Sequence, residues 1–216
     1  MATITKKRSA HADGLATSST ITSWYVKNMI PPLEVIRVLN RAKVRFMLVG
    51  AHGIAGWLPE PRATGDVDVL VGYRQHQKAV RALLAAFQFL KADDQEGVIR
   101  LSDPSTGKVL VDIMKCIQPL HREGHRHTQT VKAEGQTYKV PSLEMALAMK
   151  FGPMVSIVRV DEKKLIDASD FITIVKHNLE VNLETLAELG ELVYPGGGME
   201  IVELVRKVRA GEKLHL

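Results

Sequence analysis

The spacing of apolar residues changes about two-thirds of the way along the chain. Before residue 140, short apolar runs lie between turn residues, which is typical of buried strands. These runs predict strands at 44–50, 66–72, 97–102 and 108–114, and a hairpin over 127–141 that turns near Glu134 and Gly135. From Ser142 onward apolar residues recur every three or four positions. That period predicts helices over 142–151, 163–177, 183–193 and 199–209.

Three further helices are expected among the strands. Pro31 and Pro32 open the first, and the segments are 33–43, 51–58 and 74–90. Strands followed by a run of helices indicate an α+β class, with a mixed β-sheet, flanking helices and a C-terminal helical cap. The chain accordingly divides into a flexible lead-in at 1–30, a sheet-containing core at 31–140 and a helical region at 141–216.

The composition indicates the size of the core and the cellular compartment. The chain has 216 residues, 45% of them hydrophobic, which suits one core with a small annex. Cys116 is the only cysteine, so an internal disulfide is excluded and a reducing compartment is the simplest expectation. No window approaches the roughly 18 apolar residues of a membrane span, and the lead-in has no apolar signal region. We therefore expect a cytoplasmic protein without membrane attachment.

The charge is concentrated at the start of the chain. The net formal charge is +5, and the first 30 residues supply +3 of it through four basic residues against Asp13. The remainder is close to neutral, which argues against a general nucleic-acid-coating surface. The sequence does not exclude a local basic patch.

Candidate chemistry begins with two aspartates in one strand. Asp66 and Asp68 project to the same face because side chains alternate along a strand. Two carboxylates this close repel each other, and a bound cation removes the conflict. Carboxylate oxygens suit hard ions such as Mg²⁺, or Mn²⁺, and Mg²⁺ completes its shell with substrate phosphates.

A third carboxylate and a glycine turn extend this pattern. Asp112 lies in the middle of an apolar strand and needs a partner there, which a metal shared with Asp66 and Asp68 would provide. Three such carboxylates can hold two ions. Gly50 ends a strand, and a backbone without side-chain bulk can approach phosphates there.

The ordered motifs resemble those of the polymerase-β-like nucleotidyltransferase superfamily. A strand ending in Gly-Ala, a short helix, an Arg-x-Thr-x-Asp-x-Asp element and a later strand with a third aspartate carry the resemblance over roughly residues 33–178. The minimal nucleotidyltransferases and the abortive-infection toxin type are most similar. The resemblance implies that Asp66, Asp68 and Asp112 bind metal and are catalytic, and that 31–140 is the catalytic core.

Further site residues are carried over by the same resemblance. It implies that Lys150, on a helix after a Pro-Ser-x-Glu element, contacts a triphosphate, although a lysine on that apolar stripe can also extend to the surface. It places Gly50, Ala51, Arg62 and Thr64 near the substrate phosphates, with Ala51 offering only its backbone N–H. Arg62 and Thr64 can also be a surface charge and a loop-shaping residue.

Two other segments have less specific patterns. Asp167 and Asp170 share a helix face and either form the family's late Asp-x-x-Asp element or pair with Lys163 or Lys164. His121, His125 and His127 suggest zinc, but arginines are interleaved and the spacing fits no helical metal pair. We interpret 121–127 as a solvated basic loop that can touch an RNA or nucleotide acceptor.

These observations favour one function over two alternatives. The first is metal-dependent transfer of a nucleoside monophosphate from an NTP, such as ATP, to a hydroxyl of RNA, protein or a small molecule, with pyrophosphate released. A toxin–antitoxin role comes only from the resemblance. The second is an inactive nucleotide-binding module of the same fold, in line with Ala51 and with Ile166 where the family often has lysine. The third is an RNA-binding module, but residues 121–139 lack interleaved aromatics.

Overall fold

The computed structural model describes residues 29–214, so nearly all of the predicted lead-in lies outside the described residues. The described chain forms two compact units. The first comprises the residues up to Gly56 together with Glu60–Pro141, and the second comprises Trp57–Pro59 together with the chain from Ser142. The unit boundary thus lies close to the point where the hydrophobic period changes.

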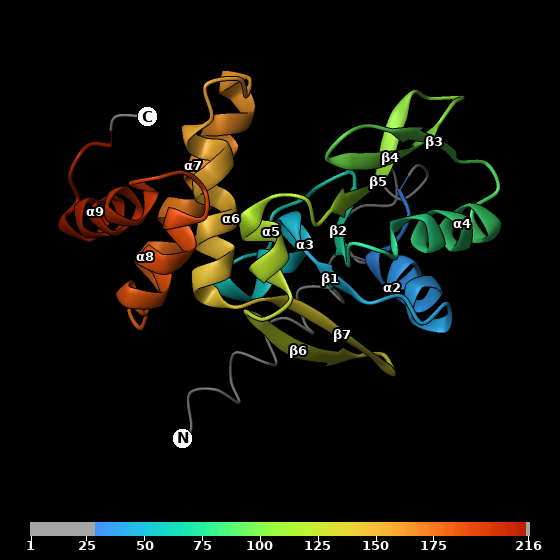
Figure 1. Cartoon of the computed structure of the whole chain (residues 1–216), viewed down its shortest axis with the longest axis horizontal. Helices are drawn as coiled ribbons and strands as arrows, with labels where there is room; N and C mark the ends of the chain where they lie inside the picture. Colours follow the sequence, from blue (N-terminus) through green and yellow to red (C-terminus); the bar gives the residue numbers. More distant parts are fainter. Residues whose placement is uncertain (1–28, 215–216) are drawn as a thin grey trace. The chain divides into compact units, whose positions relative to one another are not determined.

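The first unit contains all the strands that are described (Figure 1). Its elements, in chain order, are α2 (Pro32–Arg41), β1 (Phe46–Leu48), α3 (Gly50–Ile54), the 3-10 turn η2 (Ala55–Trp57, whose last residue belongs to the second unit), β2 (Val67–Val71), α4 (His76–Ala86), β3 (Lys91–Asp94), β4 (Val98–Asp103), β5 (Lys108–Lys115), α5 (Pro119–Gly124), β6 (Thr128–Ala133) and β7 (Gln136–Pro141).

A mixed five-stranded sheet organises this unit, with strand order β1-β2-β5-β4-β3. β2 and β5 run parallel, and the other neighbouring pairs are antiparallel. In the parallel pair, Val67 lies opposite Val111 and Val69 opposite Ile113. A parallel pair needs a crossover connection, which α4 and the β3–β4 hairpin supply between β2 and β5.

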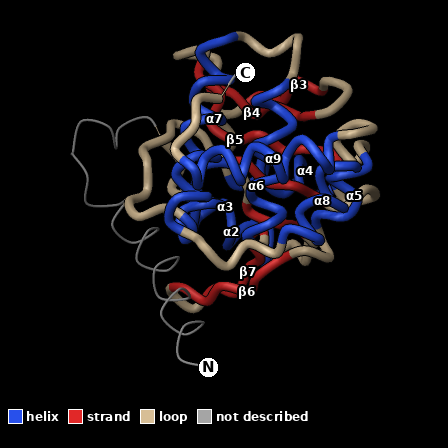
Figure 2. Tube along the Cα trace, turned by 90° about the vertical axis from the view of Figure 1, so that its left-hand side faces the viewer, coloured by secondary structure: helices blue, strands red, loops and turns tan. Residues whose placement is uncertain are grey.

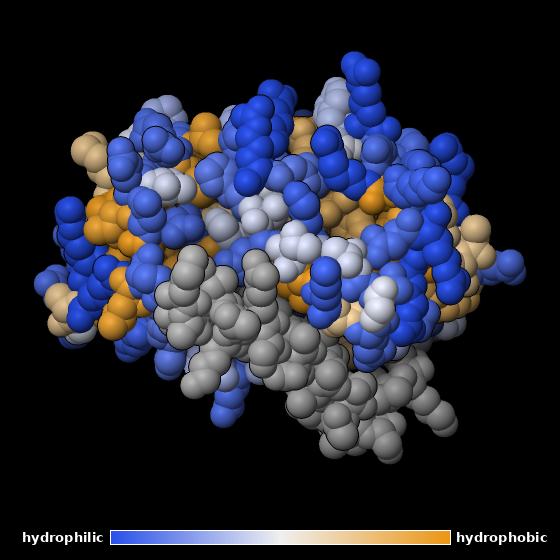
Figure 3. Space-filling model, turned by 90° about the horizontal axis from the view of Figure 1, so that it is seen from below, coloured by the Kyte–Doolittle hydropathy of each residue, from blue (hydrophilic) through white to orange (hydrophobic). Residues whose placement is uncertain are grey.

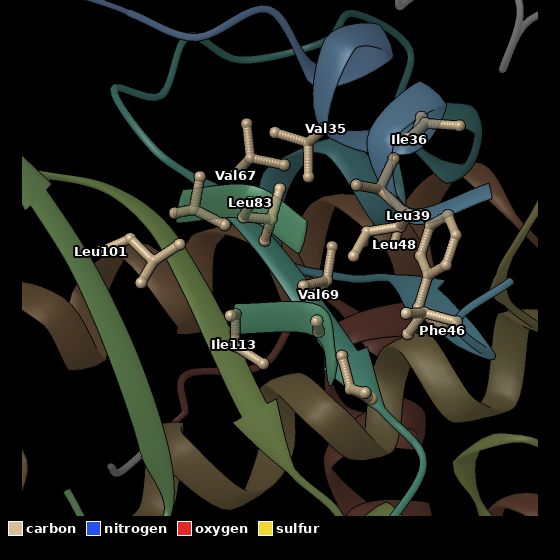
Figure 4. Packing of buried hydrophobic residues seen from close by; sticks show 14 of the residues in the cluster. Val35, Ile36, Leu39, Phe46, Leu48, Val67, Val69, Leu83, Leu101 and Ile113 are labelled. Atoms are coloured by element: carbon tan, nitrogen blue, oxygen red, sulfur yellow. The ribbon is translucent and has the colours of Figure 1, made fainter. Parts of the chain in front are cut away.

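The hydrophobic core lies between one face of this sheet and two helices (Figure 4). Alternate strand residues such as Val67 and Val69 point into it, because successive side chains alternate faces. Helix α2 adds Val35, Ile36 and Leu39, and α4 adds Leu83, all fully buried. The opposite side chains of β2, including Asp68, are therefore directed away from this core.

The predicted hairpin at the end of this unit is confirmed. β6 and β7 pair antiparallel over Thr128–Ala133 and Gln136–Pro141, and both are drawn in red in Figure 2. The two turn residues, Glu134 and Gly135, have φ of 45° and 71°. A two-residue turn with positive φ at both positions matches the twist of the strands that it connects.

Several elements differ from the sequence-based expectation. Residues 121–124 of the segment interpreted as a solvated basic loop lie in the short helix α5, whose first residue is Pro119, at a position where no N–H is needed. The expected helix over 51–58 divides into α3 and the 3-10 turn η2. β3 was not expected, because all four of its residues are exposed and none has a high β propensity. The strand forms through its antiparallel pairing with β4.

The second unit is helical throughout its regular elements, which are α6 (Leu143–Val155), α7 (Asp161–His177), α8 (Leu183–Glu191) and α9 (Gly197–Ala210). Ser142 and Asn182 cap α6 and α8, because their side-chain oxygens accept hydrogen bonds from the Met145 and Thr185 amides. At the end of α7, the Asn178 side-chain amide donates hydrogen bonds to the Trp57 and Ile174 carbonyls. Together with the mixed sheet, this confirms the predicted α+β class.

Hydrophilic residues cover most of the face drawn in Figure 3, and hydrophobic residues show in several separate areas. Five of the exposed large apolar side chains of the second unit lie around the start of α7, at Ile157, Val158, Val160, Leu165 and Ile166, and two more, Leu179 and Met199, lie elsewhere in the unit. Within residues 29–214, no helix combines the length and apolarity that crossing a membrane requires.

Candidate active site

Three aspartates of the first unit converge on one place. β2 and β5 pair in parallel with Asp68 directly opposite Asp112, and Asp66 precedes β2 by one residue. One carboxylate oxygen from each of the three lies within 4.8 Å of the others, and all three residues are half-buried. The structure thus brings together the residues that the sequence singled out for metal binding.

The arrangement of these oxygens fits a divalent cation. Mg²⁺ holds oxygen ligands at about 2.1 Å, so two ligands of one ion lie roughly 3–4 Å apart. Small side-chain rotations bring oxygens less than 4.8 Å apart into that range. Three carboxylates so close together repel one another, and a cation between them relieves that repulsion. The half-buried setting leaves room for water and phosphate oxygens to complete the shell.

Gly50 lies directly against this cluster. It begins α3 with φ of +60°, a left-handed conformation that favours glycine. A Cβ at this position would lie 1.9 Å from Asp68 Oδ2, so no side chain fits unless Asp68 moves. The Val49 amide donates to the Asp68 carbonyl at 2.9 Å and fixes the two strands at this point. The glycine therefore shapes the site by leaving the Asp68 carboxylate in place.

Thr64 orients the first aspartate. Its hydroxyl donates a hydrogen bond to Asp66 Oδ1 at 2.5 Å, from the loop that leads into β2. Hydrogen bonds to ligand carboxylates hold them in a binding orientation. Arg62 is exposed in the same loop, and its guanidinium donates a long hydrogen bond of 3.4 Å to the Ala63 carbonyl. Ala51 is buried in the first turn of α3.

His52 is a buried residue near the cluster that the sequence reasoning missed. It is 7% exposed, and among the described residues no hydrogen-bond partner meets its Nε2 atom. Burial lowers its pKa to about 4, although the charge of Asp66 acts in the opposite direction. The imidazole is therefore neutral at pH 7. The available signal was its position in the apolar segment AHGIAGWL. A histidine in such a segment is expected to be buried, and buried polar groups normally have a hydrogen-bond partner or a functional role.

Arg100 is a second residue that the sequence reasoning missed. It lies opposite Asp112 in the antiparallel pairing of β4 and β5, and its Nε is 3.9 Å from Asp112 Oδ1. The side chains are 42% and 20% exposed, so the pair is weakened by solvent. The sequence predicted the two strands, at 97–102 and 108–114, but not the pairing register that puts Arg100 opposite Asp112 on one face.

Lys150 lies in the second unit, on α6, and is buried. Its Nζ is 2.9 Å from Asp167 Oδ1 and 2.7 Å from Asp170 Oδ2, both buried on α7. Arg159 adds a contact of 2.8 Å from Nη2 to Asp167 Oδ2. Both aspartates thus pair with Lys150, and Asp167 also pairs with Arg159. Lys150 and the two carboxylates are buried, the Arg159 side chain is 36% exposed, and the group joins α6 to α7.

The histidines at 121–127 do not gather metal ligands. Within residues 29–214, the three aspartates are the one group of at least three His, Cys, Asp or Glu residues whose ligand atoms meet. Cys116 donates to the His121 carbonyl at 3.3 Å, which occupies its thiol hydrogen. Burial lowers the pKa of His121 and of His125. The zinc alternative receives no support from this geometry.

Comparison with solved structures identifies the fold of the chain. No protein-family model matches the chain, and no curated protein is similar to it in sequence. An antigenic nucleotidyltransferase-like protein from Paracoccidioides brasiliensis superposes with a TM-score of 0.52 at 17% identity, covering 94% of this chain and 95% of its own. A lincosamide antibiotic adenylyltransferase with lincomycin bound gives a TM-score of 0.47 at 15% identity, covering 68% and 99%. The first likeness extends over nearly the whole of both chains, and the chain therefore has the nucleotidyltransferase fold.

Proposed function

We propose that the protein transfers a nucleoside monophosphate from an NTP to an acceptor hydroxyl and releases pyrophosphate. The convergence of Asp66, Asp68 and Asp112 on adjacent strands carries this proposal. A nucleotidyltransferase fold supports it, since three clustered carboxylates are the ligands that an Mg²⁺- or Mn²⁺-bound triphosphate requires.

The reaction exchanges one phosphorus–oxygen bond for another. The acceptor oxygen attacks the α-phosphorus, the bond from that phosphorus to the bridging oxygen breaks, and pyrophosphate leaves with both bonding electrons. The acceptor proton passes to a carboxylate or to water. Bound divalent metal supplies charge neutralisation at the phosphates and activation of the attacking oxygen.

The chain's own residues position these groups. Asp66 and Asp68 hold the metal-bound triphosphate, with Thr64 fixing the orientation of Asp66. Asp112 lies opposite Asp68 and orients the acceptor hydroxyl or takes its proton. Gly50 lies against Asp68 and has no side chain, so a phosphate that approaches there would meet the backbone N–H groups of the first turn of α3, at Gly50 and Ala51. Arg62, exposed at the edge of the loop, adds positive charge for the leaving pyrophosphate.

The experiment uses each NTP labelled at the α- or the γ-phosphate, with Mg²⁺ and separated RNA, protein and small-molecule fractions of a cell extract. The α-label should move to one fraction, and the γ-label should leave as pyrophosphate. Asp112→Asn should reduce transfer by at least about a hundredfold, because losing a metal ligand raises the barrier by several kcal/mol and each 1.36 kcal/mol is tenfold. Asp93→Asn, an exposed aspartate of β3 in the same sheet, is the matched control.

Three results separate the alternatives. Transfer of γ-label to the acceptor would indicate a kinase and contradict the proposal. Metal-dependent NTP binding without transfer in any fraction would indicate the inactive nucleotide-binding module. The labelled fraction identifies the acceptor class, and a toxin role would require that the labelled molecule loses its function in the cell.

A further inference from the structure

A pocket of about 260 Å³ lies in the first unit, at the opposite end of the strands from the aspartate cluster. Its lining residues are Arg45, Gly72, Tyr73, Cys116, Arg122 and His125. Gly72 directly follows β2 and Cys116 directly follows β5, while Arg45 directly precedes β1. Gly72 is four residues beyond Asp68, which at about 3.3 Å per strand residue is roughly 13 Å. The pocket is thus separate from the proposed nucleotide site.

Local packing holds the walls of this pocket in place. The Gly72 amide donates to the Arg45 carbonyl at 3.2 Å, which joins the exit of β2 to the entry of β1. On the other side, α5 packs so closely on β1 and β2 that a Cβ at Gly124 would meet Leu70 at 2.8 Å and Met47 at 3.2 Å. Helix α5 follows β5 in the chain (Figure 1) and presents Arg122 and, just after its end, His125.

The residues that line the pocket carry positive charge and include no acidic side chain. Two of them are arginines. Within residues 29–214, neither the Arg45 nor the Arg122 guanidinium meets an acidic partner, whereas nearby Arg126 forms two contacts of 2.8 and 2.9 Å with Glu123. Two unneutralised guanidiniums repel each other across one pocket, and an anion between them relieves that repulsion.

His125 is a further pocket residue that favours a bound anion. Neither ring nitrogen of His125 has a hydrogen-bond partner among the described residues, and both are buried. Burial, followed by the cations Arg45 and Lys139, lowers the pKa of His125. Arg45 and Arg122 likewise act on Cys116, opposing the rise in its thiol pKa that burial causes. The fields of the two arginines therefore overlap inside the pocket, where no described acid cancels them.

We propose that this pocket binds a phosphomonoester or free phosphate, held by Arg45 and Arg122 and hydrogen-bonded by His125. A volume of about 260 Å³ holds more than a phosphate group alone and leaves room for a sugar-sized substituent beside the exposed ring of Tyr73. Planar guanidinium groups match phosphate oxygens in pairs, which gives both charge and direction. The assignment does not depend on the proposed nucleotidyl transfer.

The test is calorimetric titration of the full-length protein with inorganic phosphate and, separately, with ribose 5-phosphate. EDTA is present throughout, so the aspartate cluster holds no divalent metal and repels anions. Both Arg45→Gln and Arg122→Gln should weaken binding by at least about tenfold, since each removes a charge-assisted contact. Both side chains are on the surface, so the fold should be preserved. Arg126→Gln is the matched control and should bind as the wild type does.

Comparing inorganic phosphate with ribose 5-phosphate distinguishes a site for free phosphate from a site for a phosphomonoester. Tighter binding of ribose 5-phosphate than of phosphate, with no binding of ribose, would assign a sugar phosphate or related phosphomonoester. Equal binding of the two would assign a site for free phosphate. Binding that Arg45→Gln and Arg122→Gln leave unchanged, or no heat from either ligand at about 10 mM, roughly the upper limit for a specific small-molecule site, would overturn the proposal. Retained binding in Asp68→Asn would show that the pocket acts independently of the aspartates.

Discussion

Gly50 shows how much of the site depends on a missing side chain. Its φ is +60°, and a Cβ would overlap the Asp68 carboxylate. Gly107, in the turn before β5, has a similar φ of +69°, but a Cβ there would have no heavy atom within 4 Å. The two glycines therefore separate backbone strain from displacement of the carboxylate.

Replacing each glycine by alanine tests this distinction. Both variants should lose about 1–2 kcal/mol of unfolding free energy, the cost of a left-handed conformation for an L-residue. Gly50→Ala should in addition weaken metal-dependent NTP binding by at least about tenfold, because Asp68 must move. Titration calorimetry with and without Mg²⁺ measures the effect. Equal NTP affinity in the Gly50 and Gly107 variants would show that Asp68 adapts without loss.

His52 gives the protein a predictable response to acid. Its folded-state pKa is about 4, below the ordinary value of 6.5, so the unfolded chain binds the proton more tightly. The stability present at neutral pH is therefore lost as pH falls from about 6.5 towards 4. At pH 5 this amounts to about 2 kcal/mol, since one pKa unit corresponds to 1.36 kcal/mol.

The variant His52→Gln isolates this contribution. Between pH 7 and pH 5, wild type should lose about 2 kcal/mol more than the variant in urea unfolding without divalent metal. His121 and His125 are present in both proteins, so their effects cancel in the comparison. Parallel pH dependence in the two proteins would mean that His52 is protonated as readily in the folded as in the unfolded chain.

At the scale of elements, the contact between α6 and α7 rests on buried charge. Lys150 meets both Asp167 and Asp170, so its removal takes a buried cation away from two buried carboxylates. Breaking a buried pair by deleting one partner typically costs about 3–5 kcal/mol. Lys150→Ala should therefore lower the unfolding free energy by roughly that amount. The exposed Lys163→Ala on α7 is the control and should change it by less than about 0.5 kcal/mol.

The same variant tests the triphosphate contact that the family resemblance implies for Lys150. Reduced stability with unchanged NTP affinity, measured at a temperature where the variant is folded, would assign Lys150 to structure alone. An affinity loss of tenfold or more would support a phosphate contact, which is worth about 1.5–3 kcal/mol when charge-assisted.

The elements also show where sequence reasoning succeeds and where it stops. β2 and β5 were predictable because both faces of these strands are mostly apolar, and their aspartates stood out against that background. The hairpin turn at Glu134 and Gly135 was predictable from local chemistry. β3 is polar and exposed and exists through pairing with β4, and the partners of Lys150 lie 17 and 20 residues away on another helix. Local spacing contains neither kind of information.

At the scale of the whole molecule, ligand binding and stability are linked. A metal–nucleotide complex that binds only the folded first unit stabilises it by about 2.7 kcal/mol at a hundred times its dissociation constant. The melting temperature should thus rise with NTP and Mg²⁺ together and remain nearly unchanged with NTP in EDTA. Asp68→Asn should abolish the rise. An equal rise with and without metal would place the nucleotide away from the aspartates.

The domain limits of 31–140 and 141–216 remain a prediction about function. The described residues divide between Pro141 and Ser142, but Trp57–Pro59 belongs with the helical unit. That crossing could not be read from the hydrophobic period, which carries no information about long-range contacts such as the hydrogen bond from the Asn178 side chain to the Trp57 carbonyl, 121 positions away. We propose that the first unit carries the chemistry, since the aspartates and the arginine-lined pocket both lie in it.

The contact between Gly50 and Asp68 restricts the order in which this sequence can change over evolution. A side chain at position 50 is incompatible with the carboxylate at 68 in its present place, because its Cβ would lie 1.9 Å from Asp68 Oδ2. A lineage that abandons the chemistry can therefore lose Asp68 first and accept a larger residue at 50 only afterwards. In descendants of this fold, a bulky residue at position 50 would mark a site whose second aspartate has already gone.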